Sequence, residues 1–423
     1  MNWRLKNGVI VSPHSEPRGG SLGVCGDTID ASAADDCIVC DLEKCSYVYP
    51  ALINTHDHLR GNYQPRCGPK PGNYYLNWLP WDNDLKASPC YAERTKALPI
   101  DESYLLSSYK TLFSGIATVS DHFPHKLNKS ILPTLPIRAV EKYAIAHECS
   151  SFELQWGDDL ASEYQYAVQN ECPFITHIAE GFDTETMDTL SKLDRIGILD
   201  DHSLLVHCLA FTDDDIKKTA AANASISWCG ASNIFMFGTT AKIRKFMIAG
   251  VNVTLGTDSA HTGSENILAE MKYDRELYRN MYGEDLSAKK IFEMVTINSA
   301  KAFWMQDKIG TLENGKLADV LVVKGRNSNP YENLVNASMD DIELLTVGGT
   351  PVYGEERFLN LLGGKLQPNY TMIKVGTKNK FRDMFVIGDP NALYNRIRSK
   401  VGFKKMLSFL PFEPDFQTSN KNA

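Results

Sequence analysis

The residues best suited to chemistry are two histidines separated by a single residue. His56 and His58 lie in ALINTHDHLRGN, residues 51–62, where an apolar run ends. In a strand, side chains at positions i and i+2 point to the same face. The two imidazoles are therefore expected side by side, which is the arrangement that two ligands of one metal ion need.

Other polar side chains also follow apolar runs. His177 comes after CPFIT, with Glu180 three residues later; His207 follows SLLV, and Asp258 follows VNVTLGT. One histidine after a strand is commonly an ordinary polar residue, so the repeated placement is what indicates a site. Imidazoles and a carboxylate brought together would form a nitrogen- and oxygen-rich site suited to a divalent transition metal.

The elements that would have to position these residues follow from the periodicity of residues 51–305. Short apolar runs alternate with segments of helical periodicity, which predicts parallel strands connected by helices. About 250 residues is the usual span of an eight-stranded α/β barrel, whose strands present their carboxyl ends at one mouth. A fourth strand is expected near 149–155. Helices are expected at 101–114, 158–171, 184–194, 212–222, 240–249 and within 263–300.

The regions flanking this barrel have strand-and-turn patterns. Residues 1–50 and 306–360 contain short apolar runs separated by glycine, asparagine and proline. The fold predicted for the chain is thus a (β/α)8 TIM-like barrel at 51–305, with a small β-sandwich formed from both chain ends. No pattern assigns residues 361–423, which are treated as a C-terminal extension.

Composition excludes several classes of protein. The 423 residues carry a net charge of −8, whereas a nucleic-acid-binding protein would present a basic patch. No apolar run approaches the ~18 residues of a membrane helix, and MNWRLKNGVIV lacks the apolar core of a signal peptide.

The ten cysteines are scattered along the chain, which is typical of a protein whose thiols are reduced. Cys37 and Cys40 would face opposite sides of a strand, which disfavours a zinc site there. A cytoplasmic protein with no membrane or nucleic-acid partner is expected.

The ordered motifs resemble the amidohydrolase superfamily, and within it the cytosine-deaminase-like branch of heterocycle aminohydrolases and chlorohydrolases. The matching segments are H-x-H at 56–58, HIAE at 177–180, HC at 207–208, SN at 232–233, GTDS at 256–259 and NGKLADVLVV at 314–323. The resemblance spans about residues 1–355. The sequence departs from the family pattern at two places. Pro50-Ala51 stands where the family usually has a Pro-Gly turn, and the segment WCGASN lacks the proline that family members commonly have before Ser232. No lysine occupies the position that bridges two metals in dinuclear branches.

The resemblance implies that His56, His58, His177 and Asp258 hold one divalent ion, with zinc favoured over iron or manganese. Such an ion lowers the pKa of a bound water from ~15.7 to about 7.

Asp258 would also orient that water, Glu180 would carry its proton, and His207 would stabilise charge at the attacked carbon. The alternative for Glu180 is a surface residue opening the next helix. Chloride leaves without a proton whereas ammonia needs one, so Glu180 favours deamination.

Substrate contacts are expected from residues near the barrel mouth. The long loop after the first strand carries Tyr74, Tyr75, Trp78 and Trp81, which could cover a planar heterocycle or form a packed lid. Arg60 could bind an anionic group or form a surface ion pair. One of His122, His125 and His261 is expected to contact substrate. The predicted substrate-binding residues are Arg60, Trp78, Trp81, His122 and His261.

These inferences predict hydrolytic deamination of an aminated nitrogen heterocycle. Cyclic-amide or halide hydrolysis is the alternative within the superfamily, and a catalytically silent scaffold is a third hypothesis. A small heterocyclic substrate is the expected partner, and a homodimer is the oligomer considered. His14 and His202 are expected to be surface residues, whereas His147 is left unassigned.

Overall fold

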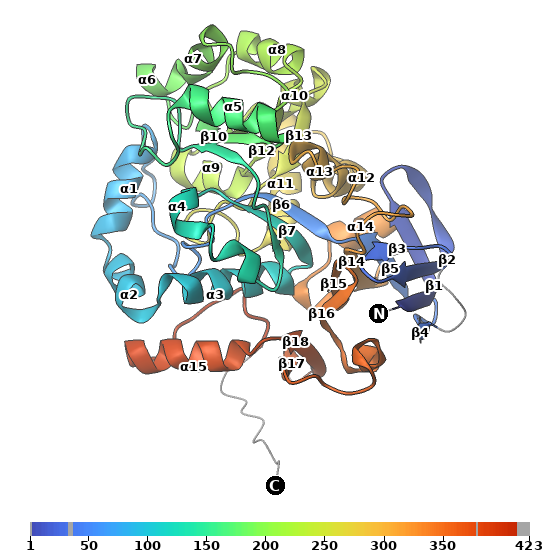
Figure 1. Ribbon diagram of the computed structural model, residues 1–423. Coiled ribbons are helices and arrows are strands. Elements are labelled where there is room, and N and C mark those ends of the chain that lie inside the picture. Colours follow the sequence, from blue (N-terminus) through green and yellow to red (C-terminus); the bar gives the residue numbers. More distant parts are fainter. Residues whose placement is uncertain (1, 33–36, 378–379, 413–423) are drawn as a thin grey trace.

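The middle of the chain forms two parallel sheets in the computed structural model, which describes residues 2–32, 37–377 and 380–412 (Figure 1). The three-stranded sheet contains β6 (Leu52–Asp57), β7 (Ile116–Asp121) and β8 (Arg138–Ala139). The five-stranded sheet runs in the order β13 (Asn252–Leu255), β12 (Ser225–Trp228), β11 (Ser203–His207), β10 (Phe174–Ile178) and β9 (Ala144–Ala146). Their residues are nearly all buried, because helices cover parallel strands and leave them no solvent face.

Hydrogen bonds connect the two sheets where β6 approaches β13. The Asp258 amide donates to the His56 carbonyl at 3.0 Å, and Thr55 Oγ1 donates to the Leu255 carbonyl at 2.8 Å. The first of these bonds joins the segment that follows β13 to the end of β6. The carboxyl ends of both sheets therefore lie together.

Helices separate most of these strands, as the alternating pattern predicts. Asp159 caps α5 by accepting from Ala161 and Ser162, while Thr212 and Asp215 form a capping box on α8. The helices between β7 and β13 are α4 (His125–Asn128), η1 (Leu132–Thr134), α5 (Leu160–Asn170), α6 (Thr184–Met187), α7 (Thr189–Arg195), α8 (Asp213–Ala221), α9 (Gly230–Phe237) and α10 (Ile243–Ile248). After β13 come α11 (Ile267–Tyr282), α12 (Ala288–Met294) and α13 (Ile297–Ala302).

Two details of the predicted alternation were wrong. The fourth parallel strand is β9 at Ala144–Ala146, not a segment near 149–155. Its three residues, and the two of β8, are too short to show a strand period. The helix expected at 184–194 is divided into α6 and α7, because Asp188 ends one helix and begins the other.

A long excursion separates β6 from β7. It contains α1 (Trp78–Ala87), α2 (Pro89–Ala97) and α3 (Ile100–Phe113). Asn77 caps α1 and Ser88 caps α2, each accepting a backbone amide two or three residues later. These helices lie along one side of the parallel sheets (Figure 1).

Both chain ends contribute strands to one ten-stranded sheet, in which β5 lies antiparallel to β14 with Val48 opposite Val322. The N-terminal strands are β1 (Asn2–Ser12), β2 (Ser15–Cys25), β3 (Thr28–Ile29), β4 (Ile38–Asp41) and β5 (Ser46–Pro50). The C-terminal strands are β14 (Val320–Lys324), β15 (Ile342–Val347), β16 (Thr350–Glu355), β17 (Tyr370–Thr377) and β18 (Lys380–Ile387). Short helices α14 (Pro330–Val335), η2 (Met339–Asp341) and η3 (Glu356–Leu362) interrupt them.

The segment after residue 360, which no sequence pattern assigned, has two structural roles. Strands β17 and β18 extend the ten-stranded sheet, and helix α15 (Pro390–Val401) packs on α2 and α3 (Figure 1). Arg396 on α15 pairs with Glu102 on α3 at 2.7 Å. The C-terminal segment therefore braces the helices that follow β6.

Two apolar cores hold these parts together. The larger core lies around the parallel sheets and includes Leu204, Val206 and Ile226, which are all buried. The smaller packs under the ten-stranded sheet, with Trp3 donating from Nε1 to the Gly349 carbonyl at 3.0 Å. Among the described helices, none combines the length and the apolar character needed to cross a bilayer.

Candidate metal centre and active site

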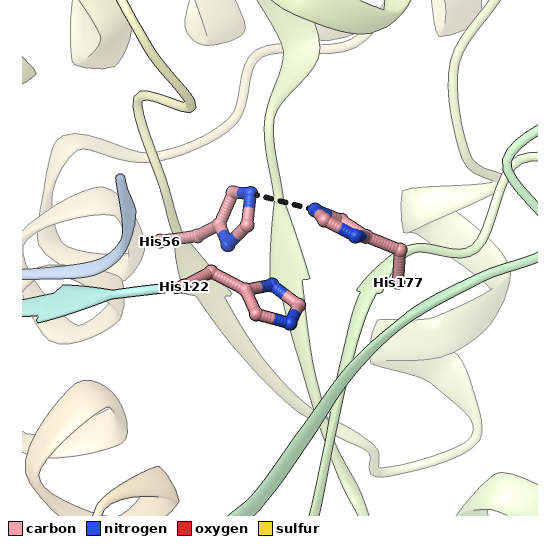
Figure 2. A group of neighbouring side chains, drawn as sticks. All are labelled: His56, His122 and His177. Atoms are coloured by element: carbon pink, nitrogen blue, oxygen red, sulfur yellow. Dashed lines mark hydrogen bonds between the residues drawn. The ribbon is translucent and has the colours of Figure 1, made fainter. Parts of the chain in front are cut away.

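The histidines predicted to bind metal converge at the carboxyl ends of the parallel strands. His56 lies in β6, with His58 just after it, and His177 lies in β10. Figure 2 shows His56 and His177 facing each other with His122 beside them. The Nε2 atoms of His56 and His177 are 3.3 Å apart. Two imidazoles bound tetrahedrally to one ion at 2.0–2.1 Å would have their nitrogens about 3.3–3.4 Å apart. The spacing thus fits a shared ion.

Backbone carbonyls fix the orientation of two of these rings. His58 Nδ1 lies 3.0 Å from the His122 carbonyl, and His177 Nδ1 lies 2.7 Å from the His147 carbonyl. A carbonyl only accepts hydrogen bonds, so each Nδ1 must carry the proton. Each Nε2 then holds a free lone pair, which is the form of imidazole that binds a metal.

Asp258 completes this group. Its Oδ1 lies 3.4 Å from His58 Nε2 and 3.8 Å from His56 Nε2. Its Oδ2 accepts hydrogen bonds from Ser232 Oγ at 2.7 Å and from Thr262 Oγ1 at 2.8 Å. Burial alone would raise the pKa of Asp258, but the imidazoles of His58 and His56 hold it well below its usual range. Both oxygens of the ionised carboxylate are thus held, since Oδ1, which is directed at the histidines, also accepts from the Ser259 amide at 2.9 Å.

Backbone strain also marks this centre. Asp258 and His207 adopt positive φ angles of 53° and 71°, in a region that residues other than glycine rarely occupy. Such conformations persist where the surrounding structure enforces them, and they cluster at functional sites.

Glu180 and His207 form a second pair beside the ligands. His207 Nε2 lies 3.5 Å from Glu180 Oε1, and His207 Nδ1 lies 2.8 Å from Asn233 Oδ1. Glu180 is only 6% exposed. Burial raises its pKa well above the usual value, as do the nearby carboxylates of Asp258 and Glu148. The alternative of a surface residue opening a helix does not describe it, because α6 begins later, at Thr184.

A cavity of about 440 Å³ opens beside these groups. Four predicted substrate-contact residues, Arg60, Trp78, Trp81 and His261, line it together with His58, His177, Glu180, His207 and Asp258. Trp81 stacks on His261 with ring centroids 5.1 Å apart. A flat apolar wall beside a polar centre suits a planar heterocycle.

His122 and His125 lie elsewhere. His122 is fully buried and is absent from the cavity lining; its ring stacks on His177 with centroids 4.1 Å apart. His125 packs on Tyr143, also at 4.1 Å. Of the three histidines considered for substrate contact, the structure brings only His261 to the cavity, and His122 supports a predicted ligand from behind.

Other expectations from the sequence have mixed outcomes. Tyr74 and Tyr75 do not line the cavity, and the Tyr75 hydroxyl donates to Asp84 at 2.6 Å. His14 is exposed as predicted, but the surface placement of His202 was wrong. His202 is buried against Trp304, with Nδ1 2.9 Å from the Cys172 carbonyl. Trp304 is distant in sequence, so no local pattern could have predicted this packing.

The sequence interpretation missed several residues of the cavity wall. His147 lines the cavity and ends the apolar run YAIAH, which is the same signal that identified His177 and His207. The sequence alone does not assign it a role, because β9 has only three residues and does not show the period of a strand. Trp156, Gln64 and Arg94 also line the cavity, and they come from loops and a helix with no strand-end signal.

A buried ion pair lies directly behind the H-x-H segment. Lys110 Nζ, on α3, donates to Asp57 Oδ2 at 2.8 Å and to Asn62 Oδ1 at 2.9 Å. Asn54 and Thr257 donate to the same Asp57 oxygen at 3.3 and 3.2 Å. Asn62 Nδ2 donates to the other Asp57 oxygen at 2.9 Å. The residue between the two histidines is thus anchored by four side chains, which fixes the segment that carries them.

The arrangement defines an α/β protein with a candidate metal centre at the carboxyl ends of parallel strands. Residues 166–352 match the amidohydrolase family. Over 246 residues, 54% of this chain and 56% of the relative, the chain is 28% identical to a 5-methylthioadenosine/S-adenosylhomocysteine deaminase from Pyrococcus abyssi. It spans about half the length of the curated relatives it matches.

Two solved structures resemble the fold. One is an adenosine deaminase from Xanthomonas campestris with bound zinc, with a TM-score of 0.70, 17% identity and coverage of 95% of this chain and 98% of that one. The other is an atrazine chlorohydrolase from Arthrobacter aurescens complexed with zinc, with a TM-score of 0.68, 19% identity and coverage of 85% and 98%. The resemblance of the motifs to the amidohydrolase superfamily is thereby confirmed.

Proposed function

We propose that this protein is a metal-dependent hydrolase that deaminates an aminated nitrogen heterocycle. The observations that support the proposal are that His56, His58 and Asp258 lie close enough to share one ion, that His177 Nε2 lies 3.3 Å from His56 Nε2, and that Glu180 lines the adjoining cavity. The family match, and the relatives that are named as deaminases, support the same reaction.

One divalent ion, with zinc favoured over iron or manganese, would be held by His56, His58, His177 and Asp258. When bound, the ion supplies a nucleophile at neutral pH by lowering the pKa of water to about 7. Asp258 Oδ1 would orient that water, a role supported by the hydrogen bonds from Ser232 and Thr262 to the other oxygen. The absence of a bridging lysine supports one ion rather than two.

Glu180 would move the proton from water to the heterocycle and its leaving amine. Burial raises the pKa of Glu180 well above its usual value, which suits this role because the carboxyl then holds a transferred proton more readily than an exposed carboxylate does. His207, held by Asn233, would stabilise charge at the attacked carbon. Trp78, Trp81 and His261 would hold the ring.

The two parallel sheets are proposed to be parts of one eight-stranded barrel spanning residues 51–305. The hydrogen bonds between the segment after β13 and the end of β6 support this closure. Residues 1–50 and 306–360 are proposed to form a β-sandwich, supported by the pairing of β5 with β14. The C-terminal extension from residue 361 would add β17 and β18 to it.

The cellular setting is also a proposal. All ten cysteines are free, as expected in a reducing compartment such as the cytoplasm. The negative net charge supports a small-molecule substrate rather than a nucleic acid. A homodimer remains the oligomer that we propose.

A screen for ammonia release tests the reaction. Protein loaded with zinc is incubated with aminopurines, aminopyrimidines, pterins and aminotriazines, and ammonia is measured alongside loss of substrate. Equal yields of ammonia and deaminated product are expected. Release of chloride from chlorotriazines, or opening of cyclic amides without ammonia, would instead support the alternative hydrolases of the superfamily, for which the zinc-bound chlorohydrolase fold is the precedent.

Metal analysis separates an enzyme from a silent scaffold. Protein purified without chelator is expected to contain close to one equivalent of metal. Less than about 0.2 equivalents, with no turnover after reconstitution, would favour the scaffold hypothesis.

A further inference from the structure

Two arginines of the cavity wall have no role in the chemistry described above. Arg60 follows β6, and Arg94 lies on α2; both line the cavity. Arg94 is only 5% exposed, its Nη2 has no hydrogen-bond partner, and its Nη1 donates to the Arg60 carbonyl at 3.3 Å. Arg60 stacks over Phe123, and Arg94 stacks over Tyr91. The two guanidinium groups are therefore held in place by aromatic rings rather than by carboxylates.

The acidic side chains closest in sequence are engaged elsewhere. Glu93 accepts from Tyr63 at 2.5 Å and from Lys405 at 2.8 Å. Asp82, in the same cavity wall, pairs there with Lys86 at 2.5 Å, and Asp84 accepts from Tyr75. Within residues 2–32, 37–377 and 380–412, no carboxylate forms an ion pair with Arg60 or Arg94.

Such an arrangement is unfavourable without a ligand. A buried charge that lacks a counter-charge is destabilising, and guanidinium does not escape the cost by losing its proton near neutral pH. Burial and the neighbouring Arg60 lower the pKa of Arg94, which shows that its surroundings disfavour positive charge. An anion bound between the two guanidinium groups would supply the counter-charge and lower the cost of burying Arg94.

Gln64 supplies a second, independent sign of a missing ligand. It is 3% exposed and lines the same cavity, and neither its carboxamide oxygen nor its nitrogen has a partner. Buried amides in native proteins are normally hydrogen-bonded. Its carboxamide leaves a nitrogen donor and an oxygen acceptor unsatisfied in the cavity wall, and a polar substrate group is suited to pair with them.

We propose that Arg60 and Arg94 form an anion subsite and that Gln64 completes it, so that the heterocycle deaminated here carries a carboxylate or phosphate group. This inference rests on the proposed function, because it assigns a second recognition group to the same substrate. Guanidinium binds either anion through paired N–H donors, so the shared chemistry is an oxyanion.

The C-terminal extension gains a role from the same contacts. Lys405 Nζ reaches Glu93, the residue before Arg94, and lies 4.3 Å from the ring of Tyr63, the residue before Gln64. Residues from the end of the chain thus hold in place both segments that carry the anion subsite.

The test compares substrates that differ only in the anionic group. Turnover by the zinc-loaded enzyme is measured for adenosine, adenosine 5′-carboxylic acid and adenosine 5′-monophosphate, and the same neutral and anionic pairing is applied to any other heterocycle that is deaminated. A charge-assisted hydrogen bond of this kind corresponds to about 10- to 150-fold in kcat/KM. We expect kcat/KM to be at least tenfold higher for the carboxylate or for the phosphate than for the neutral compound. The anionic compound that is preferred identifies which of the two groups the subsite recognises.

Substitution then assigns the preference to the subsite. Arg94→Gln is expected to reduce the preference, measured as the ratio of kcat/KM for the anionic and neutral partners, below threefold. Arg244→Gln makes the same change at an arginine that pairs with Glu284 outside the cavity, and this variant should retain the preference for the anionic substrate. If Arg94→Gln does not fold, Arg60→Gln carries the same test. An unchanged preference in the variants, or no preference in the parent, would overturn the proposal.

A binding measurement separates this proposal from the proposed function. Thermal denaturation of the zinc-loaded protein is followed with inorganic phosphate or acetate, with sodium chloride matched for ionic strength. Stabilisation by either anion that Arg94→Gln abolishes would support the subsite even if no heterocycle were deaminated. Deamination of neutral heterocycles without anion preference or stabilisation would leave the function standing and overturn the subsite.

Discussion

Replacing Glu180 by glutamine is the perturbation that tests the proposed proton transfer. Glutamine keeps the size and polarity of the side chain but cannot accept and return a proton. Glu180 lies 3.5 Å from His207 and is not one of the four predicted ligands, so the metal should be retained. The variant therefore removes proton transfer while leaving the metal and its ligands in place.

The expected loss is large because bulk water cannot easily replace a buried carboxyl that is 6% exposed. General acid–base catalysis typically contributes ~10²–10⁴ in rate, or about 2.7–5.4 kcal/mol of activation free energy. We expect kcat to fall by at least ~10²-fold with a modest change in KM, since Trp78, Trp81 and the arginines would still bind the ground state.

The assay measures steady-state ammonia release and metal content on the same preparations. Glu185→Gln is the matched control: it is the same change on an exposed helix, where Glu185 pairs with Lys192, and its activity should stay within about twofold of the parent. Turnover by Glu180→Gln within a few-fold of the parent would refute the proton-transfer role and reopen halide hydrolysis. Loss of metal from Glu180→Gln would mean that Glu180 takes part in binding it.

Three further predictions follow from the same contacts. His177→Ala should lower the zinc content measured after dialysis, because it removes one of four ligands, whereas His202→Ala should retain zinc; equal contents would contradict the assignment. Lys110→Met should lower the free energy of unfolding by about 3–5 kcal/mol in urea titrations, because it leaves Asp57 buried and unpaired, and a loss under about 1 kcal/mol would contradict this. Burial raises the pKa of Glu270, which lies near the equally buried Asp274, so its protonated form contributes stability that is fully present below pH 4.5 and is lost as the pH rises through the raised pKa. Thermal unfolding should show this decline in the parent and a weaker one in Glu270→Gln; identical profiles would refute it.

The strand-end histidines and aspartate were predictable because a period of two and a sharp apolar boundary are local signals. His56, His58 and His177 each follow or end a buried run, and a parallel sheet necessarily brings such ends together. The same logic applied to His147, and it was missed only because β9 has three residues. Short strands give too few alternations to distinguish from a loop.

The anion subsite and the support behind the ligands could not be predicted in this way. Arg94 and Lys110 lie on helices, and their role depends on which helix face meets the strands. Arg94 forms no ion pair within the described part of the chain, and the neighbouring carboxylate of Glu93 is bound by Lys405, 311 positions away. Contacts of this range are set by tertiary packing, for which the sequence carries no local pattern.

Titration of the metal-free protein with zinc tests the central claim most directly. Ammonia release from a heterocycle that the parent deaminates is measured after each addition, and bound zinc is counted on the same samples. The proposed one-metal deaminase predicts that activity rises in proportion to bound zinc and reaches its plateau at one equivalent per chain. Activity that needs two equivalents would contradict the single-ion site, and ammonia release that is independent of zinc would contradict the metal-dependent mechanism itself.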